Sequence, residues 1–471
     1  MLVESVSYPD ASPEQINQAM NHAMESFPRF RSLPSSKRAQ LLFEIQKELC
    51  KHKDTIISIA NQETSLGEVR LTMEFNRTIS EIERFAKLCE QNVWGNLKDK
   101  VKTKDIAYEI EMLPVGPVVV IGACNFPFAI SVVGTDTISA LMVGCPVVVK
   151  SHPGHPKTCQ ILADAVAQAI EKTQSPKHCF CLLHGKKNAV TQTLVRHKHT
   201  KSVAFTGSLN GGKALQEGCQ NRNKPIPFYG EMGSLNPLFI LPGMVRANTP
   251  KLAGDFLRAV NLFAGQMCTK PGAMFVLETS MSEEFIRGLE KATLQEGVLP
   301  MLSEEIQQNY IETCRNLRNK LQLISTSDLG KIKVPNPGII QIFKMKGSDF
   351  LENPELRAEA FGPSSILVIV KDEDELLTIA NSLEGSLTAS IHSDASDHEL
   401  ASQLFPVLGA KVGRLLHNGF PPGVVPGRAT HHGGPWPATT DARFTSIGEE
   451  SYKRFLRPIL KQRRDRTSLR D

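Results

Sequence analysis

Apolar residues recur at helical spacing through the first part of the chain, residues 12–93. Leu41 and Ile45, for example, stand about one helical turn apart and would line the same side of a helix. The pair Ser12 and Pro13 is typical of a helix start, because serine caps the free amide groups of the first turn and proline fits its first position. We therefore expect the chain to open with helices alone.

Short runs of β-branched residues appear from about residue 105 onward. They are Val118-Val-Val-Ile121, Pro146-Val-Val-Val-Lys150 and Ser202-Val-Ala-Phe205. Segments with helical periodicity, such as residues 158–172, separate them. Unbroken apolar strands that alternate with helices are typical of a parallel, doubly wound sheet, which predicts an α/β fold for this part.

A second alternation of strands and helices begins after Glu231. The pattern predicts a helix over about residues 251–263, a strand over 273–277, a helix from Ser282 and a strand over 365–370. Each strand is again a short apolar run, and each helix has periodic apolar positions. The sequence therefore predicts two α/β units.

Two stretches depart from this alternation. Residues 418–446 are rich in Gly, Pro, Thr and His without clear periodicity, which predicts a long ordered loop that makes functional contacts. Residues 113–133 are apolar enough to suggest a membrane span, but Pro114, Gly116 and Pro117 interrupt them. We expect a buried strand followed by a loop there, and no membrane association.

The composition is that of an ordinary globular protein. The 471 residues are 41% hydrophobic and 22% charged, which excludes disorder and favours two or more domains. The net charge of +5 is concentrated in the last nineteen residues, which hold eight Lys and Arg against two Asp. A nucleic-acid-binding domain spreads its basic residues over a face, so we expect no nucleic-acid partner and a tail that is solvated or contacts another subunit.

The cysteines and the first residues favour a reducing compartment. Met1-Leu-Val-Glu-Ser lacks the basic and apolar regions of a secretory signal, and the ten cysteines are scattered, so free thiols in the cytoplasm are expected. Cys179 and Cys181 with His184 resemble metal ligands. Their alternation fits a strand, however, and no second cysteine pair lies at zinc spacing, so we assign no metal.

Several polar residues have a chemical interpretation and a structural one, and both stay open at this point. Gly207 and Ser208 lie between a strand and a helix start, where backbone amides can bind a phosphate or simply form a turn. Lys150 ends a strand, where it can hold ribose hydroxyls or extend to water.

Three further residues could act on a substrate. Cys268 lies between glycine-containing turns, so it is either an activated nucleophile or a small buried side chain. Glu231 stands between two glycines and is either a general base or a solvated turn residue. Asn125 follows a buried strand and can either donate to an oxyanion or form a turn.

Six motifs occur in an order that makes the chain resemble the aldehyde dehydrogenase superfamily over nearly its whole length. They are Asn125-Phe-Pro127, Val149-Lys150-Ser-His-Pro153, Phe205-Thr-Gly-Ser208, Glu231-Met-Gly-Ser234, Gly265-Gln-Met-Cys268 and Glu359-Ala-Phe-Gly-Pro363. Three longer segments resemble the branch that oxidises 2,5-dioxovalerate (α-ketoglutarate semialdehyde) to 2-oxoglutarate. They cover residues 144–153, 225–231 and 432–440.

The resemblance implies an α/β fold with a Rossmann-like cofactor domain, an α/β catalytic domain and a small oligomerisation hairpin. The expected boundaries are 1–95 with 116–232 for the NAD(P)-binding domain and 233–425 for the catalytic domain. Residues 96–115 and 426–471 would form the hairpin and the C-terminal segment, which would pair with each other. A homo-oligomer, either a dimer or a tetramer, is expected.

The resemblance also implies roles for the three candidate catalytic residues. Cys268 would attack the aldehyde carbonyl, and Asn125 with the Cys268 backbone N–H would hold the oxyanion. Hydride would pass to the nicotinamide of NAD or NADP and leave a thioester. Glu231 would then activate the water that releases the acid.

The resemblance also implies which residues contact the cofactor. It implies that Lys150 and Glu359 contact the two riboses, that Gly207 and Ser208 contact the pyrophosphate, and that Phe361 lies on the nicotinamide side. The choice between NAD and NADP stays open.

A substrate that carries a carboxylate needs a cation at the entrance. Arg77, Arg258 and Lys270 are candidates, although each could equally be a surface or interface charge. Broad aliphatic specificity and an acylating reductase are the alternative activities. A non-catalytic protein on the same fold is disfavoured because Cys268, Glu231 and Asn125 are all present.

Overall fold

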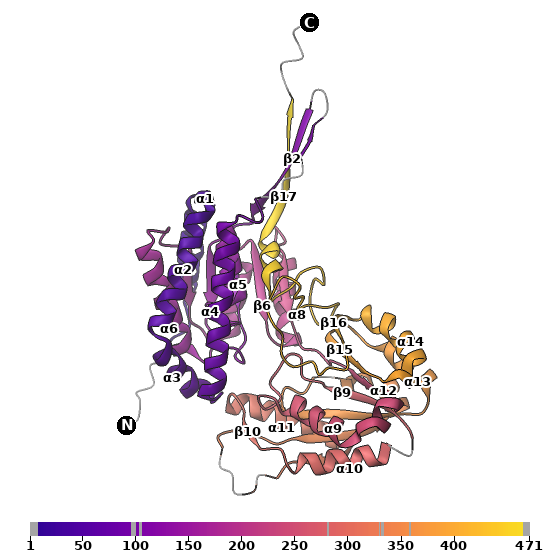
Figure 1. The fold of residues 1–471 in the computed structure, drawn as a ribbon. Helices are drawn as coiled ribbons and strands as arrows, with labels where there is room; N and C mark the ends of the chain where they lie inside the picture. Colours follow the sequence, from indigo (N-terminus) through magenta and orange to yellow (C-terminus); the bar gives the residue numbers. More distant parts are fainter. Residues whose placement is uncertain are drawn as a thin grey trace.

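The structure is a computed structural model that describes residues 8–95, 100–102, 106–279, 282–328, 330, 334–357 and 359–464. Figure 1 shows two α/β units and a narrow group of strands that projects away from both. The chain begins in the helices of one unit, and its last strand belongs to the projecting group.

The chain opens with four helices, which confirms the helical prediction for this part. Ser12 caps the first helix, and its side chain and that of Gln15 form a reciprocal capping box. The apolar stripe of the second helix is buried, with Leu41 and Ile45 both inaccessible to solvent. The helices are α1 (Pro13–Ser32), α2 (Ser35–Lys51), α3 (Lys53–Thr64) and α4 (Glu68–Glu90).

A five-stranded parallel sheet forms the centre of the first unit, in the order β5-β4-β3-β6-β7. Its strands are almost entirely buried, which explains their unbroken apolar sequences. They are β3 (Val118–Ile121), β4 (Val147–Lys150), β5 (Phe180–Leu183), β6 (Ser202–Thr206) and β7 (Phe228–Glu231). The accompanying helices are α5 (Thr135–Val143), α6 (Pro156–Lys172), α7 (Asn188–Arg196) and α8 (Leu209–Gln220).

A seven-stranded sheet forms the second unit, in the order β11-β13-β14-β9-β8-β15-β16. All neighbouring strands are parallel except the antiparallel pair β11 and β13. The strands are β8 (Leu238–Ile240), β9 (Ala273–Leu277), β11 (Gln322–Thr326), β13 (Gln341–Lys346), β14 (Ser364–Val370), β15 (Ser386–His392) and β16 (Val412–His417). A small ladder joins β10 (Leu299–Pro300) to β12 (Pro337–Gly338).

The helices of the second unit are α9 (Pro242–Asn261), α10 (Ser282–Thr293), α11 (Glu304–Arg318), α12 (Gly347–Glu352), α13 (Glu373–Ser382) and α14 (His398–Gly409). Short 3-10 helices are η1 (Pro354–Arg357), η2 (Ala395–Asp397) and, near the C-terminus, η3 (Glu449–Phe455). For α9, the sequence predicted a start near residue 251, and this prediction is wrong. The helix α9 begins at Pro242 and contains Pro250.

The projecting group is a three-stranded antiparallel sheet in the order β1-β2-β17. It consists of β1 (Lys100–Lys102), β2 (Ile106–Pro114) and β17 (Leu456–Arg464), so the end of the chain pairs with the expected hairpin region. Residues 96–99 and 103–105 of that region and residues 465–471 of the basic tail lie outside the described residues.

The two large sheets present opposite edges to each other. Residues that follow β3, β6 and β7 stand at the carboxyl edge of the first sheet, because these strands are parallel. The segments before β8, β9 and β14 stand at the amino edge of the second. Hydrogen bonds between the two edges include one from the side chain of Asn125 to the carbonyl of Gln266, at 3.0 Å.

Residues 418–448 connect β16 to η3 as one long loop. All of them are described, and they contain neither helix nor strand apart from a single β-bridge between Thr439 and Glu231. This confirms the predicted ordered loop.

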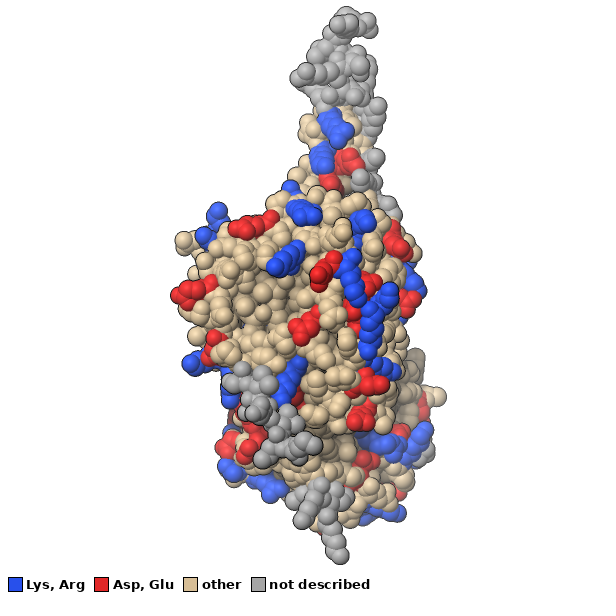
Figure 2. Space-filling model, turned by 90° about the vertical axis from the view of Figure 1, so that its left-hand side faces the viewer, with Lys and Arg blue, Asp and Glu red and all other residues tan. Residues whose placement is uncertain are grey.

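Among the described residues, no helix is long and apolar enough to cross a membrane. On the face in Figure 2, acidic and basic side chains are interleaved.

Candidate active site

Cys268 lies in a tightly constrained loop between α9 and β9. Phe263, Ala264 and Gly265 have backbone φ angles of 55°, 53° and 66°, in the left-handed region that residues other than glycine rarely adopt. Such strained conformations persist only where surrounding contacts fix them, and they are frequent at functional sites. The loop therefore holds Cys268 in a position that the local sequence alone would not favour.

Buried side-chain amides that bind backbone groups on both sides of Cys268 supply these contacts. Gln266 is fully buried; it donates to the carbonyl of Phe263 at 3.0 Å and accepts from the backbone N–H of Leu302 at 3.0 Å. Asn236, also fully buried, donates to the carbonyls of Cys268 at 2.8 Å and Lys270 at 3.0 Å. The backbone before and after Cys268 is thus fixed by two buried side-chain amides.

Glu231 is the last residue of β7 and is buried, with an exposed fraction of 3%. The long C-terminal loop covers it, through the bridge to Thr439 and a bond from the N–H of Met232 to the carbonyl of Ala438, at 2.8 Å. The hydroxyl of Ser446 donates to one of its carboxylate oxygens. The interpretation of Glu231 as a solvated turn residue is therefore wrong.

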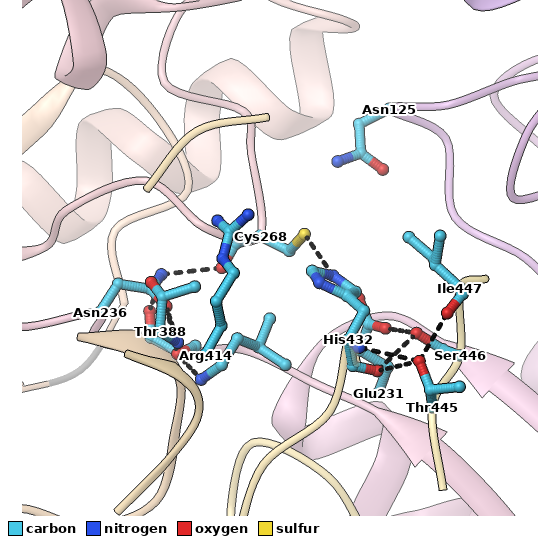
Figure 3. A network of polar contacts seen from close by, with 12 residues as sticks. Asn125, Glu231, Asn236, Cys268, Thr388, Arg414, His432, Thr445, Ser446 and Ile447 are labelled. Carbon is cyan, nitrogen blue, oxygen red and sulfur yellow. Dashed lines mark hydrogen bonds and ion pairs between the residues drawn. The ribbon is translucent and has the colours of Figure 1, made fainter. Parts of the chain in front are cut away.

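His432, from the same loop, connects Glu231 to Cys268. Its Nε2 lies 3.1 Å from Oε1 of Glu231 and 3.5 Å from Sγ of Cys268. The backbone N–H of His432 donates to the hydroxyl of Thr445 at 2.8 Å. Figure 3 shows His432 between the two other side chains, of which Glu231 comes from β7 and Cys268 from the loop before β9.

These contacts set the charges of the three groups. Burial would raise the pKa of Glu231, but His432 and Ser446 lower it below its ordinary value. Burial disfavours the charged form of His432, yet Glu231 and Cys268 raise its pKa to about 10. Burial raises the pKa of the Cys268 thiol, and His432 offsets this only in part. At neutral pH the site holds a Glu231–His432 ion pair beside a neutral thiol.

The substitution His432→Phe is expected to lower the thermal unfolding midpoint at pH 8, and the deficit is expected to shrink toward pH 10. The pKa of His432 in the folded chain, about 10, lies above its unfolded value. The stabilisation from this proton is therefore fully present below about pH 6.5, the unfolded-state pKa, and is lost as the pH rises through the folded-state pKa. Calorimetry of both proteins between pH 8 and pH 10 measures this, with the exposed His398→Phe as control. A deficit that stays constant would contradict the ion pair.

Helix α4 fixes the loop that carries Asn125. Arg70 donates to the backbone carbonyl of Asn125, and Glu74 accepts from the backbone N–H groups of Phe128 and Ala129 at 2.8 and 3.0 Å. Asn125 is 5% exposed. Its amide is therefore held beside the Cys268 loop by two charged side chains of one helix.

The residues expected to bind a cofactor stand at the same sheet edge as Glu231. Lys150 ends β4 and is 8% exposed, and burial lowers its pKa. Ser208 caps α8, because its hydroxyl accepts from the N–H of Gly211 at 3.2 Å. A Cβ added to Gly207 would lie 2.5 Å from the ring of Phe205, so this glycine allows the strand and helix to approach closely.

Glu359 and Phe361 lie in the turn before β14, at the amino edge of the second sheet, and both are partly buried. Burial raises the pKa of Glu359 to about 7, although Lys270 and the backbone N–H of Ser234 act in the opposite direction. Lys270 is itself buried and donates to the carbonyl of Ser364 at 2.6 Å. The structure thus places Lys270 close enough to Glu359 to act on the pKa of its carboxyl group.

The other two cations suggested by the sequence are paired on helix surfaces. Arg77 contacts Glu81 at 2.8 Å, and Arg258 contacts Asp255. Arg414 in β16 is different, because its side chain is drawn beside Cys268 in Figure 3, where a Cys268 thiolate would raise the pKa of the guanidinium. Its Nη atoms donate to the carbonyls of residues 421 and 423, and its Nε has no partner among the described residues.

The sequence did not single out His432, Arg414 or Ser446. His432 opens one of the segments used for the resemblance, and a histidine before two glycines in an aperiodic loop was the only available sign. The strand predicted at Cys179 and Cys181 corresponds to β5, Phe180–Leu183, which contains Cys181, while Cys179 directly precedes it. His184 pairs with Gln160 at 2.9 Å.

Comparison with known proteins gives a consistent family assignment. The family model "Aldehyde dehydrogenase family" matches residues 4–327. The chain is 35% identical to alpha-ketoglutaric semialdehyde dehydrogenase 2 of Azospirillum brasilense over 464 residues, which are 96% of this chain and 87% of that one. It is also 35% identical to alpha-ketoglutaric semialdehyde dehydrogenase of Acinetobacter baylyi over 471 residues, which are 98% of this chain and 89% of that one.

Solved structures show the same fold. The NADP-dependent glyceraldehyde-3-phosphate dehydrogenase of Bacillus halodurans, complexed with NADP, superposes with a TM-score of 0.80 and 20% identity, covering 97% of this chain and 92% of that one. The 1-pyrroline-5-carboxylate dehydrogenase of Thermus with bound NAD gives a TM-score of 0.82 and 20% identity, covering 97% and 87%.

Proposed function

Since the chain belongs to the aldehyde dehydrogenase family and oxidises aldehydes with NAD or NADP, we propose that its substrate is 2,5-dioxovalerate (α-ketoglutarate semialdehyde), which it converts to 2-oxoglutarate. The observation that carries this proposal is the 35% identity, over nearly the whole chain, to two proteins with that named activity. The geometry of the site supports each chemical step.

The first step is addition of Cys268 to the aldehyde carbonyl. The thiol needs to lose its proton, and His432 is placed to pass its own proton to Glu231 while it takes up the thiol proton. His432 then stays positively charged beside the new thiolate. The amide of Asn125 donates one hydrogen to Gln266, and its second hydrogen can stabilise the oxyanion that forms on the substrate.

The second step is release of the acid from the thioester on Cys268. Glu231 first releases the proton it received from His432 to solvent and becomes a carboxylate again. It then takes a proton from water, and the resulting hydroxide attacks the thioester carbonyl and expels the Cys268 thiolate. Glu231 lines two small cavities, one with Thr206 and Ser446 and one with His432 and Thr439, so space for water exists next to the carboxylate. A general base at this position favours hydrolysis over transfer to another acceptor.

The residues present fit a nicotinamide cofactor. Lys150 offers a buried cation at the end of β4, and α8 begins at Ser208 with free backbone N–H groups that suit a pyrophosphate. Glu359 and Phe361 lie at the facing edge of the second sheet, where they can contact the second ribose and the nicotinamide. When bound, the nicotinamide accepts a hydride from the substrate.

Arg414 is the cation that we assign to the distal carboxylate of the substrate. It lies beside Cys268 (Figure 3), it is partly exposed, and its Nε is not used by the described residues. A guanidinium bonded to two backbone carbonyls is also held in one orientation, which favours recognition of a carboxylate.

A substrate panel tests this assignment. We expect kcat/KM of the unaltered enzyme to be highest for 2,5-dioxovalerate among this compound, glutarate semialdehyde, succinate semialdehyde and pentanal, each with NAD and with NADP. Arg414→Gln should lower kcat/KM for the carboxylate-bearing aldehydes by about tenfold to a hundredfold, since one charged hydrogen-bond donor is lost, and should leave pentanal nearly unaffected.

The control is Arg77→Gln, which removes a guanidinium that is paired to Glu81 on α4. It should not change the ratio between the semialdehydes and pentanal. An equal loss for all aldehydes in Arg414→Gln would show that Arg414 only supports the loop. A clear preference of the unaltered enzyme for pentanal would exclude the proposed substrate while leaving aldehyde oxidation in place.

We also propose that the protein is a homo-oligomer in the cytoplasm. The projecting sheet exposes apolar side chains, with Val101 60% and Leu460 57% exposed, and a second subunit would cover them. All ten cysteines are free thiols, which suits a reducing compartment.

A further inference from the structure

The three central side chains of the site bring together one sulfur, one nitrogen and one oxygen. Sγ of Cys268, a ring nitrogen of His432 and a carboxylate oxygen of Glu231 all lie within 4.8 Å of one another. Within the described part of the chain, no other group of His, Cys, Asp and Glu side chains places three ligand atoms so close together. His432 and Glu231 are each 3% exposed, whereas Cys268 remains partly accessible.

The two distances from His432 Nε2 to Sγ of Cys268 and to the carboxylate oxygen of Glu231 match those within a tetrahedral zinc site. Zinc binds thiolate sulfur at about 2.3 Å and imidazole nitrogen or carboxylate oxygen at about 2.0–2.2 Å, so neighbouring ligands are about 3.5 Å apart for sulfur and nitrogen and about 3.3 Å apart for nitrogen and oxygen. The corresponding distances here are 3.5 Å and 3.1 Å. Small rotations of the side chains would be sufficient to admit the ion.

The chemistry of the ligands selects among metals. A thiolate with an imidazole favours zinc over magnesium or calcium, which prefer sites built from oxygen. Three protein ligands leave one tetrahedral position for water, as in accessible zinc sites. Neighbouring groups orient the ligands: Ser446 donates to the second oxygen of Glu231, and Asn236 donates to the carbonyl of Cys268.

We propose that Cys268, His432 and Glu231 form a binding site for Zn²⁺, and that the bound ion reversibly switches the enzyme off. The Cys268–His432 pair releases two protons to solvent when the ion binds, one from the thiol and one from the imidazolium, because a thiolate and a neutral imidazole are the ligands. The sulfur lone pair that would attack an aldehyde is then held by the metal, and both the base and the proton carrier are occupied. Binding of zinc rests on geometry alone, whereas only the inhibition rests on the proposed function.

The chain contains a second buried cysteine–histidine pair that serves as a matched control. Sγ of Cys159 lies 3.3 Å from Nδ1 of His155, and both residues are fully buried. This pair does not belong to a three-ligand cluster among the described residues. Comparing zinc binding at the two pairs therefore distinguishes a three-ligand site from the general affinity of thiols for zinc.

The test is a titration of the full-length protein with ZnCl₂ in competition with a chromogenic zinc chelator. We expect one tightly bound ion per chain, and X-ray absorption at the zinc edge should show one sulfur neighbour with nitrogen and oxygen neighbours. His432→Phe and Cys268→Ser should each weaken binding by at least about 100-fold, more than the loss of an outer-shell partner causes. Cys159→Ser should bind zinc like the unaltered protein.

Activity and stability give independent readings of the same site. NAD(P)H formation from an aldehyde should stop with one equivalent of zinc and return with EDTA. Zinc should also raise the thermal unfolding midpoint of the unaltered protein, because it binds the folded state, and should not raise that of Cys268→Ser. Should His432→Phe not fold, Cys268→Ser decides the question. Unchanged zinc affinity in Cys268→Ser, or a zinc spectrum without sulfur, would overturn the proposal even if aldehyde oxidation is confirmed.

Discussion

Replacing Cys268 with alanine is expected to lower NAD(P)H formation from aldehydes by at least about 10⁴-fold, because no other group can form the covalent thioester. The methyl side chain keeps the small volume of the residue, and the loop is held by Gln266 and Asn236 rather than by the thiol. Cofactor binding should therefore persist. Steady-state rates with a saturating aldehyde, together with fluorescence titration of NADH or NADPH, measure the two properties separately.

The chain offers a control for this substitution in Cys50, which is exposed on α2 and lies in a different part of the fold. Cys50→Ala should keep the rate of the unaltered enzyme. Undiminished turnover in Cys268→Ala would remove Cys268 from the mechanism. A loss of cofactor binding in the same variant would show that the loop, and not only the nucleophile, had been damaged.

Replacing Glu231 with glutamine is expected to give a burst of reduced cofactor followed by turnover that is slower by about 10²- to 10⁴-fold. Removing the carboxylate removes the main cause of the high pKa of His432, so the imidazole becomes neutral and can take the thiol proton directly. Acylation of Cys268 therefore survives. Hydrolysis of the thioester slows, because the group that activates water is gone. Stopped-flow absorbance of the reduced cofactor resolves both phases.

An external nucleophile provides the control for the second phase. Hydroxylamine attacks a thioester without a general base, so it should restore turnover in Glu231→Gln and change the unaltered enzyme little. A normal steady-state rate without a burst would exclude Glu231 as the base. A slow first phase would instead mean that His432 cannot accept the thiol proton alone.

A helix or strand was predictable wherever a local residue pattern was sufficient to define it. The apolar run at 273–277 and the acidic segment after Asp372 gave a strand and a helix at the expected positions, since burial and helix capping are local properties. The start of α9 was not predictable, because Pro250 normally marks a helix start or an interruption. In the structure the helix accommodates this proline and extends back to Pro242.

The residues of the site were predictable from the sequence only where they lie within one of the family motifs. The motifs pointed to Cys268, Glu231 and Asn125, and the contacts of these residues now explain why each is held in place. His432 lies 164 residues from Cys268 and 201 from Glu231 along the chain, so no local pattern links the three. The contacts of His432 depend on the docking of a loop without periodicity, and such docking follows from tertiary packing rather than from spacing.

The long loop of residues 418–448 also has a consequence for synthesis of the chain, because it carries His432 to Glu231 and Cys268. Glu231 and Cys268 leave the ribosome well before His432, and domains generally fold from the N-terminal side as the chain emerges. In a nascent chain that ends before this loop, the Cys268 thiol lacks the imidazole of His432, and the loop does not yet cover the carboxylate of Glu231. We therefore expect Cys268 to become reactive only after residues 418–448 have been made and have docked over Glu231.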